Sequence, residues 1–575
     1  MDDLITLFEQ PDPNYPLRYF YFPKIASLLR SIQDHDAYAS YKIIVDPERY
    51  VHNIFNLYYS ELVRQADLLL TWAQYHYPSG DYHHDVVEYR LYVAIMNAGG
   101  YLPVIDPVSG RDRLSFDHYV KIIDGRDRIC LVKRRTGNLY AIREHHLHDV
   151  DICRHVKTIS EYEYAKDGPM PLDSLDLAVV QLSASQKAVI RHARTHAVTF
   201  ALGGAGTGKS TIIMMILRQY IACGRETDLY ILCPTHMAAE NLRLRLAAVL
   251  DFDLVASLQI ITIHTFAYKK PTVHPRRTFI IFEEASMYDN LLGQIISLNN
   301  TNGRECTYLF VGDHNQLRPV RRHSVLRVLM AAFPKLICYL TDNFRSGDLI
   351  IQNATEVLYA TGVARLRLGA GYNVYQYSLS SIIDWEAPFD PDPRVAPPMF
   401  ITHRNADVLR INAALRDSIM RREDSSYEAP TDPAEYRIRK VYKNGTPIGL
   451  WEWRIGDRAR CCAKDKSGRI FNGAMCTIAA FDGAALVVEY RDELFQLPSR
   501  NLWPAYCITV HNSQGQEWDE VVFCDLSGSD IERSLAYVGL TRAKKKQHII
   551  RVNDDPELLA TDFRLVDEVL PIEAG

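Results

Sequence analysis

The sequence of 575 residues lacks several features that would place it in a common class of protein. Its 11 cysteines form no C-x-x-C pair, so they predict neither a zinc ribbon nor a disulfide framework. No apolar run approaches the roughly 18 residues of a membrane-spanning helix, and the start of the chain is acidic rather than a basic segment followed by an apolar one. We therefore expect a soluble, intracellular protein with reduced thiols and no contact with a membrane.

The chain also lacks a strong net charge. Its 65 basic and 70 acidic residues give a formal net charge of −5, which argues against a protein that coats nucleic acid nonspecifically but leaves room for a local basic channel. The length predicts about four domains. A hydrophobic content of 47% is sufficient for ordinary buried cores. The composition therefore predicts a globular, multidomain chain and does not indicate its function.

The most informative segment that is present is GGAGTGKST, residues 203–211. It fits the P-loop pattern G-x-x-x-x-G-K-[ST], in which backbone N–H groups of a glycine-rich loop point at phosphate. Lys209 is placed to reach the β- and γ-oxygens and Ser210 to ligate Mg²⁺, and the helix that follows adds its positive end. The residues that we expect to hold the nucleotide here are Gly203, Gly204, Ala205, Gly206, Thr207, Gly208, Lys209, Ser210 and Thr211.

The pattern along the chain predicts an α/β fold with several domains. Residues 1–175 carry no nucleotide motif, hold 18 of the 34 tyrosines and show helical spacing of apolar residues at 51–73, so they predict a separate, partly helical domain. From residue 176 onward, short apolar runs alternate with helical patterns, as in parallel sheets. The expected divisions are 1–175, 176–347, 348–444 with 501–575, and an inserted small β-barrel at 445–500.

Polar residues follow several of the predicted strands. Glu283 and Glu284 end an apolar run, where one carboxylate is needed to hold Mg²⁺ and the other to orient or deprotonate a water. Gln316 follows the next run and is a candidate sensor of the γ-phosphate. Arg345, in LTDNFRS, is a candidate cation for the charge that develops in phosphoryl transfer. Because ligands bind at the carboxyl ends of strands in open α/β sheets, we expect these groups to meet at one edge.

The order and wording of the motifs resemble those of superfamily 1 helicases on the RecD/Dda/PIF side of that group, over about residues 180–552. LSASQ with Gln186 resembles the adenine-reading element, and TVHNSQG at 509–515 resembles the segment that separates this branch from others. The remaining segments that carry the resemblance are CPTHMAAENL, TIHTF, the acidic motif FEEAS, GDHNQL, LTDNFRS and AYVGLTRAKK.

The resemblance implies two RecA-like P-loop NTPase domains with ATP and Mg²⁺ in the cleft between them and a nucleic-acid strand across the top. It implies that Arg345 and Arg542 reach the γ-phosphate, that Gln316 couples its presence to domain closure, and that Gly515 and Glu517 lie at the nucleotide. It implies that the insertion is SH3-like. Strand contacts are expected from Thr235, His236, His264, Thr265, His511 and Ser513, and metal contacts from Ser210 and Glu283.

The leading prediction is an ATP-dependent DNA helicase that moves 5′ to 3′ along single-stranded DNA in replication, repair or recombination. Backbone-reading motifs distinguish RNA from DNA poorly, so an RNA-directed helicase is the first alternative. A slowly hydrolysing, nucleotide-gated scaffold subunit is the second, because Glu283 stands where the family has Asp and Mg²⁺ demands near-ideal octahedral geometry. Residues 1–175 are a candidate surface for a protein partner.

Four further features are weaker. Asn512 stands where the family has Lys, which removes a positive charge from an expected phosphate contact. Residues 267–278 fill the place of the family's duplex-splitting pin with a short basic segment. The histidines of 143–155 match no standard zinc spacing, so a polar surface or a set of hydrogen-bonded histidines is preferred there. Residues 129–142 predict a β-hairpin.

Overall fold

The computed structural model gives the chain as two compact units, of which the second begins at His148. The predicted helical pattern at 51–73 lies outside the described residues. Those residues are 95, 101–104, 129–133, 138–161, 181–222, 228–268, 277–289, 305–317, 319, 324–344, 348–378, 380–392, 394–423, 427–429, 436–443, 446–463, 469–483, 485–527, 531–553 and 561–566.

The first unit contains a small antiparallel sheet in the order β1-β3-β2. Its strands are β1 (Tyr101–Pro103), β2 (Ile129–Val132) and β3 (Leu139–Ile142). Ile129 pairs with Ile142, which confirms the hairpin pairing predicted from the sequence. Helix α9 (Arg143–Ser160) follows directly and carries the histidine-rich segment.

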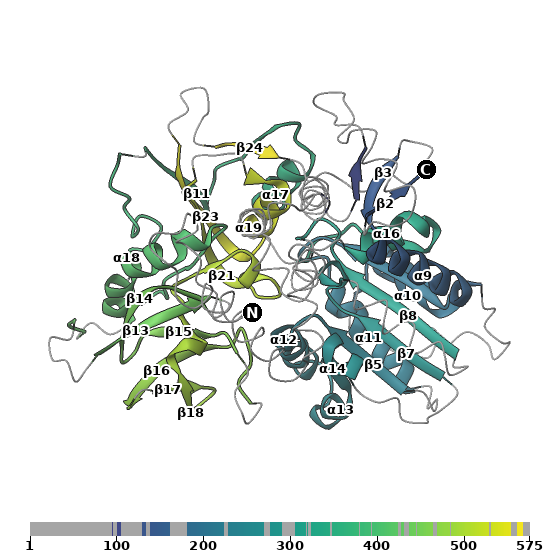
Figure 1. The fold of residues 1–575 in the computed structure, drawn as a ribbon, viewed down its shortest axis with the longest axis horizontal. Helices are drawn as coiled ribbons and strands as arrows, with labels where there is room; N and C mark the ends of the chain where they lie inside the picture. The colour runs from purple at the N-terminus through teal and green to yellow at the C-terminus, as the bar shows by residue number, and fades with distance from the viewer. Residues whose placement is uncertain are drawn as a thin grey trace, which may run out of the picture. The chain divides into compact units, whose positions relative to one another are not determined.

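The second unit contains a six-stranded parallel sheet in the order β6-β5-β7-β8-β4-β9. Apolar runs predicted five of these strands, and the pairing confirms them as parallel. In Figure 1 the strands β5, β7 and β8 lie side by side. The strands are β4 (Val198–Gly203), β5 (Asp228–Cys233), β6 (Gln259–Thr262), β7 (Arg277–Phe282), β8 (Glu305–Gly312) and β9 (Ile337–Leu340).

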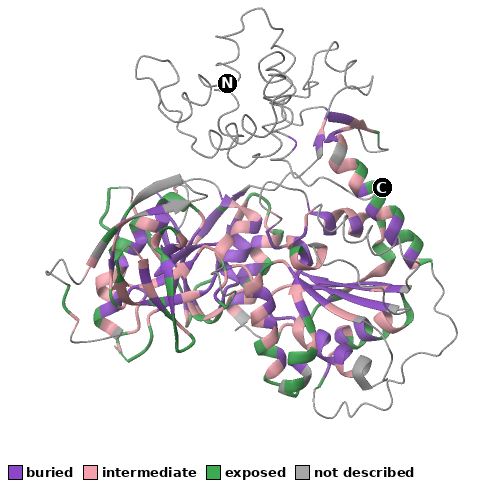
Figure 2. Ribbon diagram, turned by 60° about the horizontal axis from the view of Figure 1, so that its bottom comes forward, coloured by how far each residue is buried: buried purple, intermediate pink, exposed green. Residues whose placement is uncertain are grey.

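Both faces of this sheet are buried, because alternate residues of each strand point to opposite sides. Ala201 and Ile281 pack into one apolar cluster and Phe200 and Phe282 into the other. Figure 2 shows the strands buried between helices with exposed outer faces. The helices of this domain are α10 (Ala184–Thr195), α11 (Lys209–Ala222), α12 (His236–Ala247), α13 (Phe252–Ser257), α14 (Ile263–Tyr268), α16 (Val325–Ala332) and the short η3 (Ala285–Met287) and η4 (Pro334–Leu336).

A second parallel sheet has the order β11-β23-β21-β12-β20. Its strands are β11 (Tyr372–Tyr377), β12 (Met399–Thr402), β20 (Cys507–Thr509), β21 (Trp518–Asp525) and β23 (Ala543–Val552). Its helices are α17 (Asp348–Tyr359), α18 (Asn405–Glu423), α19 (Arg533–Leu540) and the short η6 (His511–Ser513). A small separate sheet consists of β10 (Val363–Arg365), β22 (Ile531–Glu532) and β24 (Asp562–Val566). Two parallel sheets with helices are the arrangement expected of RecA-like domains.

Antiparallel strands interrupt the second sheet in the sequence, between Tyr436 and Pro504. Their core joins that of the second sheet, since Trp453 and α18 residues such as Leu415 lie in one apolar cluster. The likeness to an SH3 domain stays a prediction. The strands are β13 (Tyr436–Lys443), β14 (Thr446–Arg454), β15 (Arg458–Cys461), β16 (Met475–Asp482), β17 (Ala485–Tyr490), β18 (Glu493–Pro498) and β19 (Leu502–Pro504), with η5 (Ser499–Asn501) between the last two.

Among the residues that the structure describes, none of the helices has the length and apolar character needed to cross a membrane. Within the same residues, no three histidine, cysteine or acidic side chains gather to hold a metal ion. In the histidine-rich α9, His155 is buried and its Nε2 lies 3.3 Å from the Tyr308 hydroxyl. Burial lowers the pKa of His155 to about 4, so this histidine is neutral at pH 7 and part of the core.

Candidate nucleotide site and strand interface

The P-loop connects the end of β4 to the start of α11. Gly206 and Gly208 have φ of 80° and 79°, a left-handed conformation that glycine adopts without strain. The Lys209 Nζ donates to the carbonyl oxygens of Gly203 at 2.9 Å and Gly204 at 2.8 Å, so the loop curls around the amine. The loop therefore combines a cation, the positive end of α11 and a ring of backbone amides, which is a cradle for phosphate.

Gln186 is fixed against this loop by the start of α10. Ser183 and Gln186 form a capping box, in which each side chain binds the other residue's backbone N–H. The Gln186 Nε2 also donates to the Thr207 carbonyl oxygen at 3.3 Å, and the side chain is buried. Two motifs that are separate in the sequence are thus brought together.

The segment after β9 returns to the P-loop and supplies two residues that the sequence analysis did not assign. The Asn343 side-chain amide donates to the Ala205 carbonyl oxygen at 2.6 Å, and the Phe344 backbone N–H donates to the Gly206 carbonyl oxygen at 2.8 Å. Phe344 is 58% exposed, which leaves an aromatic face open beside the loop. The motif LTDNFRS placed Arg345 here, but Arg345 itself lies outside the described residues.

The acidic pair follows β7 at the same edge. Glu283 is buried, and Glu284 has φ 51° and ψ 49°, a left-handed conformation that is strained for any residue but glycine. Burial and the Glu284 carboxylate raise the pKa of Glu283 to about 8, against the opposing influence of Arg245 and Lys209. The Oε2 atoms of both glutamates are buried without a hydrogen-bond partner.

These carboxylate oxygens fit a hard cation. Mg²⁺ prefers oxygen ligands such as a carboxylate and the Ser210 hydroxyl, and a cation at Glu283 would satisfy its Oε2, which the protein leaves without a partner. The donor set therefore fits the magnesium ion that the sequence predicts.

Asp313 and Gln316 follow β8. Asp313 is fully buried, and its carboxylate accepts from the Asn315 backbone N–H at 3.0 Å and from the Tyr537 hydroxyl at 2.9 Å. Gln316 is buried and its Oε1 has no hydrogen-bond partner. A buried amide without a partner is unusual, and it suits a residue that acquires one when ligand binds.

Arg542, the predicted second arginine, is buried just after α19. Its Nε donates to the Val538 carbonyl oxygen at 3.1 Å and its Nη1 to that of Gln516 at 3.4 Å. The backbone of its own domain therefore orients the guanidinium. The contact with the P-loop comes instead from Tyr537, whose hydroxyl accepts from the Ala205 N–H at 3.4 Å.

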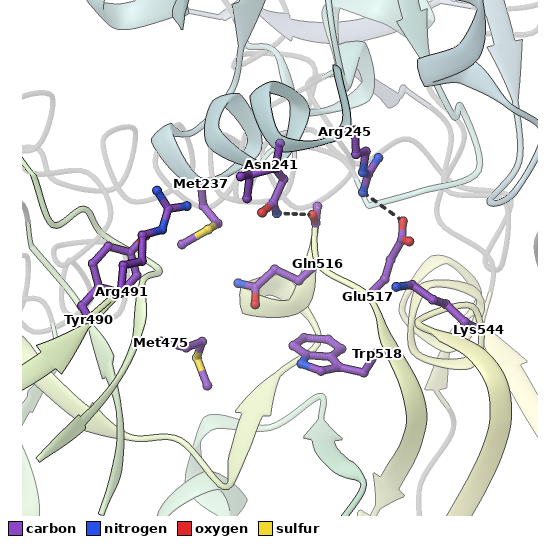
Figure 3. A pocket seen from close by; sticks show the side chains of 12 residues that line it. Met237, Asn241, Arg245, Met475, Tyr490, Arg491, Gln516, Glu517, Trp518 and Lys544 are labelled. Atoms are coloured by element: carbon purple, nitrogen blue, oxygen red, sulfur yellow. Dashed lines mark hydrogen bonds and ion pairs between the residues drawn. The ribbon is translucent and has the colours of Figure 1, made fainter. Parts of the chain in front are cut away.

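A cavity of about 400 Å³ lies beside α12, between the two sheets and the antiparallel strands (Figure 3). Arg245 of α12 donates to the Ser210 hydroxyl at 3.2 Å and to the Glu517 carboxylate at 3.3 Å. Asn241, one turn earlier on the same helix, donates to the Gly515 carbonyl oxygen at 2.9 Å. One helix of the first sheet thus holds both nucleotide candidates, Gly515 and Glu517, of the second.

The antiparallel strands also reach α12. The Arg491 guanidinium lies 2.6 Å from the Glu240 carboxylate. Burial alone would raise the pKa of Glu240, but the hydrogen bonds from Arg491 and Arg243 outweigh it and lower that pKa. Arg491 and Asp492 have φ of 55° and 62°, so they form a tight two-residue turn without glycine.

The six predicted strand contacts differ in accessibility. Thr235 is exposed and caps α12, since its hydroxyl accepts from the Ala238 N–H at 3.1 Å. His236 stacks on Phe471 with ring centroids 4.8 Å apart. Ser513 is fully buried and donates to the Val510 carbonyl oxygen at 2.7 Å. The others are the exposed His264 and the half-buried Thr265 and His511.

The fold and these loops define the class of the protein as an α/β P-loop nucleotide-binding protein with two parallel sheets. Two family models match the chain: an AAA domain at residues 181–370 and a UvrD-like helicase C-terminal domain at residues 504–550.

Several known proteins are similar in sequence. The ATP-dependent RecD2 DNA helicase of Deinococcus radiodurans is 26% identical over 384 residues, which are 64% of this chain and 48% of the relative. The RecD subunit of the RecBCD enzyme of Mycolicibacterium smegmatis is 23% identical over 64% of this chain and 70% of its own. The helicase dda of phage T4 is 30% identical over 28% of this chain and 38% of its own. The chain thus spans about half the length of the Deinococcus relative.

Among solved structures, Bacteroides Pif1 bound to single-stranded DNA covers 64% of this chain and 92% of its own, with 16% identity and a TM-score of 0.39. The family models and the sequence relatives confirm the resemblance to superfamily 1 helicases of the RecD/Dda/PIF type.

Proposed function

We propose that the protein is an ATP-dependent DNA helicase that moves 5′ to 3′ along single-stranded DNA and separates duplex. One observation carries this proposal. The P-loop of the first sheet is bonded directly to motif residues of the second, through Tyr537 to Ala205 and through Arg245 between Ser210 and Glu517. A nucleotide held in the loop would therefore touch both sheets, which is the requirement for turning hydrolysis into relative motion of two domains.

Each residue near the loop has a distinct role in this proposal. Lys209 and the loop amides hold the phosphates, and Glu284 orients the attacking water. Ser210 and Glu283 would hold Mg²⁺, which when bound neutralises charge on the β- and γ-oxygens. The open face of Phe344, beside Gln186, is suited to stack on the base.

The second sheet completes the site. Arg542, oriented by backbone carbonyls, adds positive charge for the transition state, and Glu517 meets the sugar. Gln316, with its free amide oxygen, reports the γ-phosphate. For Arg345 and for the short segment 267–278 we keep the roles predicted from the sequence, a cation for the transition state and a duplex-splitting pin. Arg345 and residues 269–276 lie outside the described part of the chain.

The strand would cross the exposed Thr235 and His264 and the stacked His236 and Phe471. An aromatic pair on the surface is suited to stack on bases of single-stranded nucleic acid. The test is ATP hydrolysis with matched DNA or RNA strands of one sequence. Stimulation by DNA well above that by RNA supports the proposal, and equal or greater stimulation by RNA would favour an RNA-directed enzyme.

A second candidate function is favoured by Glu283. Its side chain has one methylene more than the family's Asp, and Mg²⁺ demands near-ideal octahedral geometry, so this residue is suited to slow hydrolysis. In that case the protein would be a nucleotide-gated scaffold subunit. A burst of ATP hydrolysis without sustained turnover is its signature, and sustained strand-stimulated turnover would exclude it.

A further inference from the structure

The hydroxyl of Tyr537 lies at a junction that none of the assigned roles uses. Its side chain is 3% exposed on α19 of the second domain. It donates to the Asp313 carboxylate at 2.9 Å and accepts from the Ala205 N–H at 3.4 Å. One phenol of the second sheet therefore joins two separate loops of the first, the P-loop and the loop that begins at Asp313.

The contact is close as well as polar. A Cβ added at Gly204 would come within 3.0 Å of the Tyr537 oxygen, so glycine at this position lets the loop approach the phenol. Burial and the nearby Asp313 raise the pKa of Tyr537 well above its ordinary value. The hydroxyl therefore keeps its proton and remains a donor to Asp313.

Tyr537 is rigidly connected to Arg542. The Tyr537 carbonyl oxygen accepts from the Thr541 hydroxyl at 2.9 Å, and the Arg542 Nε donates to the carbonyl oxygen of Val538, the next residue of α19. A shift of the Tyr537 side chain would therefore also move the Arg542 guanidinium, because both residues are bonded to the same end of α19.

We propose that Tyr537 is a positioning residue that sets where Arg542 stands relative to the P-loop and to the Asp313–Gln316 loop. The inference rests on the proposed function, because it assigns Arg542 to the phosphates. The Tyr537 hydroxyl can contact Ala205 and Asp313 only when the two parallel sheets are close to each other, so Arg542 points at the phosphates only in that state. Loss of the hydroxyl should slow hydrolysis while leaving nucleotide and strand affinity in place.

The chain provides a matched control. Tyr506 is also buried, and its hydroxyl also donates to a buried aspartate, Asp457, at 2.9 Å. Both members of this pair lie on the side of the second sheet and its insertion, away from the P-loop. Tyr506→Phe therefore removes the same kind of hydrogen bond without removing the junction.

The experiment compares Tyr537→Phe, Tyr506→Phe and the unchanged protein. For Tyr537→Phe we expect strand-stimulated kcat to fall about tenfold, the size of one misplaced hydrogen-bonding group, with KM for ATP and strand affinity within about twofold. Tyr506→Phe should keep kcat within about twofold. Equal kcat losses in both variants, or no loss in Tyr537→Phe, would overturn the proposal.

A second readout needs no turnover. Hydrogen exchange of the peptide containing residues 203–211 should quicken in Tyr537→Phe, since the Ala205 N–H loses its acceptor, and stay unchanged in Tyr506→Phe. Unchanged exchange in Tyr537→Phe would contradict the junction even if the unchanged protein proved to be no helicase. Melting curves first establish that each variant folds. If Tyr537→Phe does not fold, Asp313→Asn takes its place, because it weakens the same hydrogen bond from the other side.

Discussion

The two parallel sheets contribute different things to the candidate site. The first sheet presents charged groups, which are Lys209 in its glycine loop, the buried Glu283 and the strained Glu284. The second presents groups held by hydrogen bonds from its backbone or from the first sheet, such as Arg542 and Glu517. In the proposed function the first sheet would therefore carry most of the chemistry and the second would control its timing, and each change below separates these contributions.

The largest effect is expected from Lys209→Ala, which removes the cation from the loop of the first sheet. Because a preorganised charge aimed at the reacting phosphate is lost, ATP hydrolysis should fall more than about 100-fold. Strand binding should persist, since the strand candidates lie on other loops. Lys187→Ala, at an exposed position of α10, is the control and should hydrolyse ATP normally. Retained hydrolysis in the Lys209 variant would remove the P-loop from the mechanism.

Next comes Gly208→Ala, which disturbs the loop without altering charge. Gly208 has φ of 79°, and a Cβ there would stand 2.3 Å from the Gln186 Nε2. We expect nucleotide affinity, measured by titration with a fluorescent ADP, to fall about tenfold or more, equivalent to 1.4 kcal/mol.

Gly362→Ala is the control for Gly208→Ala, because it introduces the same backbone strain without a steric clash. Gly362 has φ of 77° but open space around its Cβ position, so Gly362→Ala carries only the backbone strain, about 1–2 kcal/mol of stability. Its nucleotide affinity should stay normal. If both alanine variants bound ADP equally well, the placement of Gln186 against the loop would be irrelevant to binding.

A smaller effect is expected from Arg245→Ala, which cuts the link from Ser210 to Glu517. Two hydrogen bonds of a 40% exposed guanidinium are lost, so KM for ATP should rise about three- to tenfold. Arg218→Ala, which loses an exposed contact with the Val249 carbonyl oxygen of the same domain, is the control. A KM equal in the two variants would show that the second sheet gains nothing from Arg245.

The last prediction concerns stability and not activity, and the first sheet alone. The pKa of His155 is lowered by burial from 6.5 to about 4, so the unfolded chain binds the proton first as pH falls. Stability conferred by neutral His155 is present above pH 6.5 and is lost towards pH 4, by up to about 3 kcal/mol. His155→Gln keeps a partner for Tyr308 but does not titrate, so its chemical denaturation midpoint should depend less on pH in this window. An identical pH dependence would contradict the assignment.

The sequence predicted the parts of the site that one segment can carry. A glycine loop after an apolar run, and acids at the end of another, are local patterns with a physical reason, and the structure brings Lys209, Ser210 and Glu283 to one edge. Most strands of both parallel sheets were predictable for the same reason, because short apolar runs bounded by polar residues suit strands buried on both faces. The edge strands β6 and β11 were not predicted.

The links between the sheets could not be predicted in this way. Tyr537 meets Asp313 across 224 positions of sequence, and Arg245 meets Glu517 across 272. Nothing in either segment indicates its partner, because an arginine on a helix and a tyrosine in an apolar run have ordinary explanations. The turn at Arg491 and Asp492 was missed because its left-handed residues are not glycine. Phe344 and Asn343 were within reach, since they adjoin the arginine that the motif singled out.

The central claim is that nucleotide chemistry on one sheet drives directed movement through the other. The most direct test is ATP-dependent separation of DNA duplexes that carry either a 5′ or a 3′ single-stranded tail, with the Lys209→Ala protein alongside. The account predicts separation of the 5′-tailed duplex alone, and none by the variant. Separation of neither duplex, or preference for the 3′ tail, would contradict it.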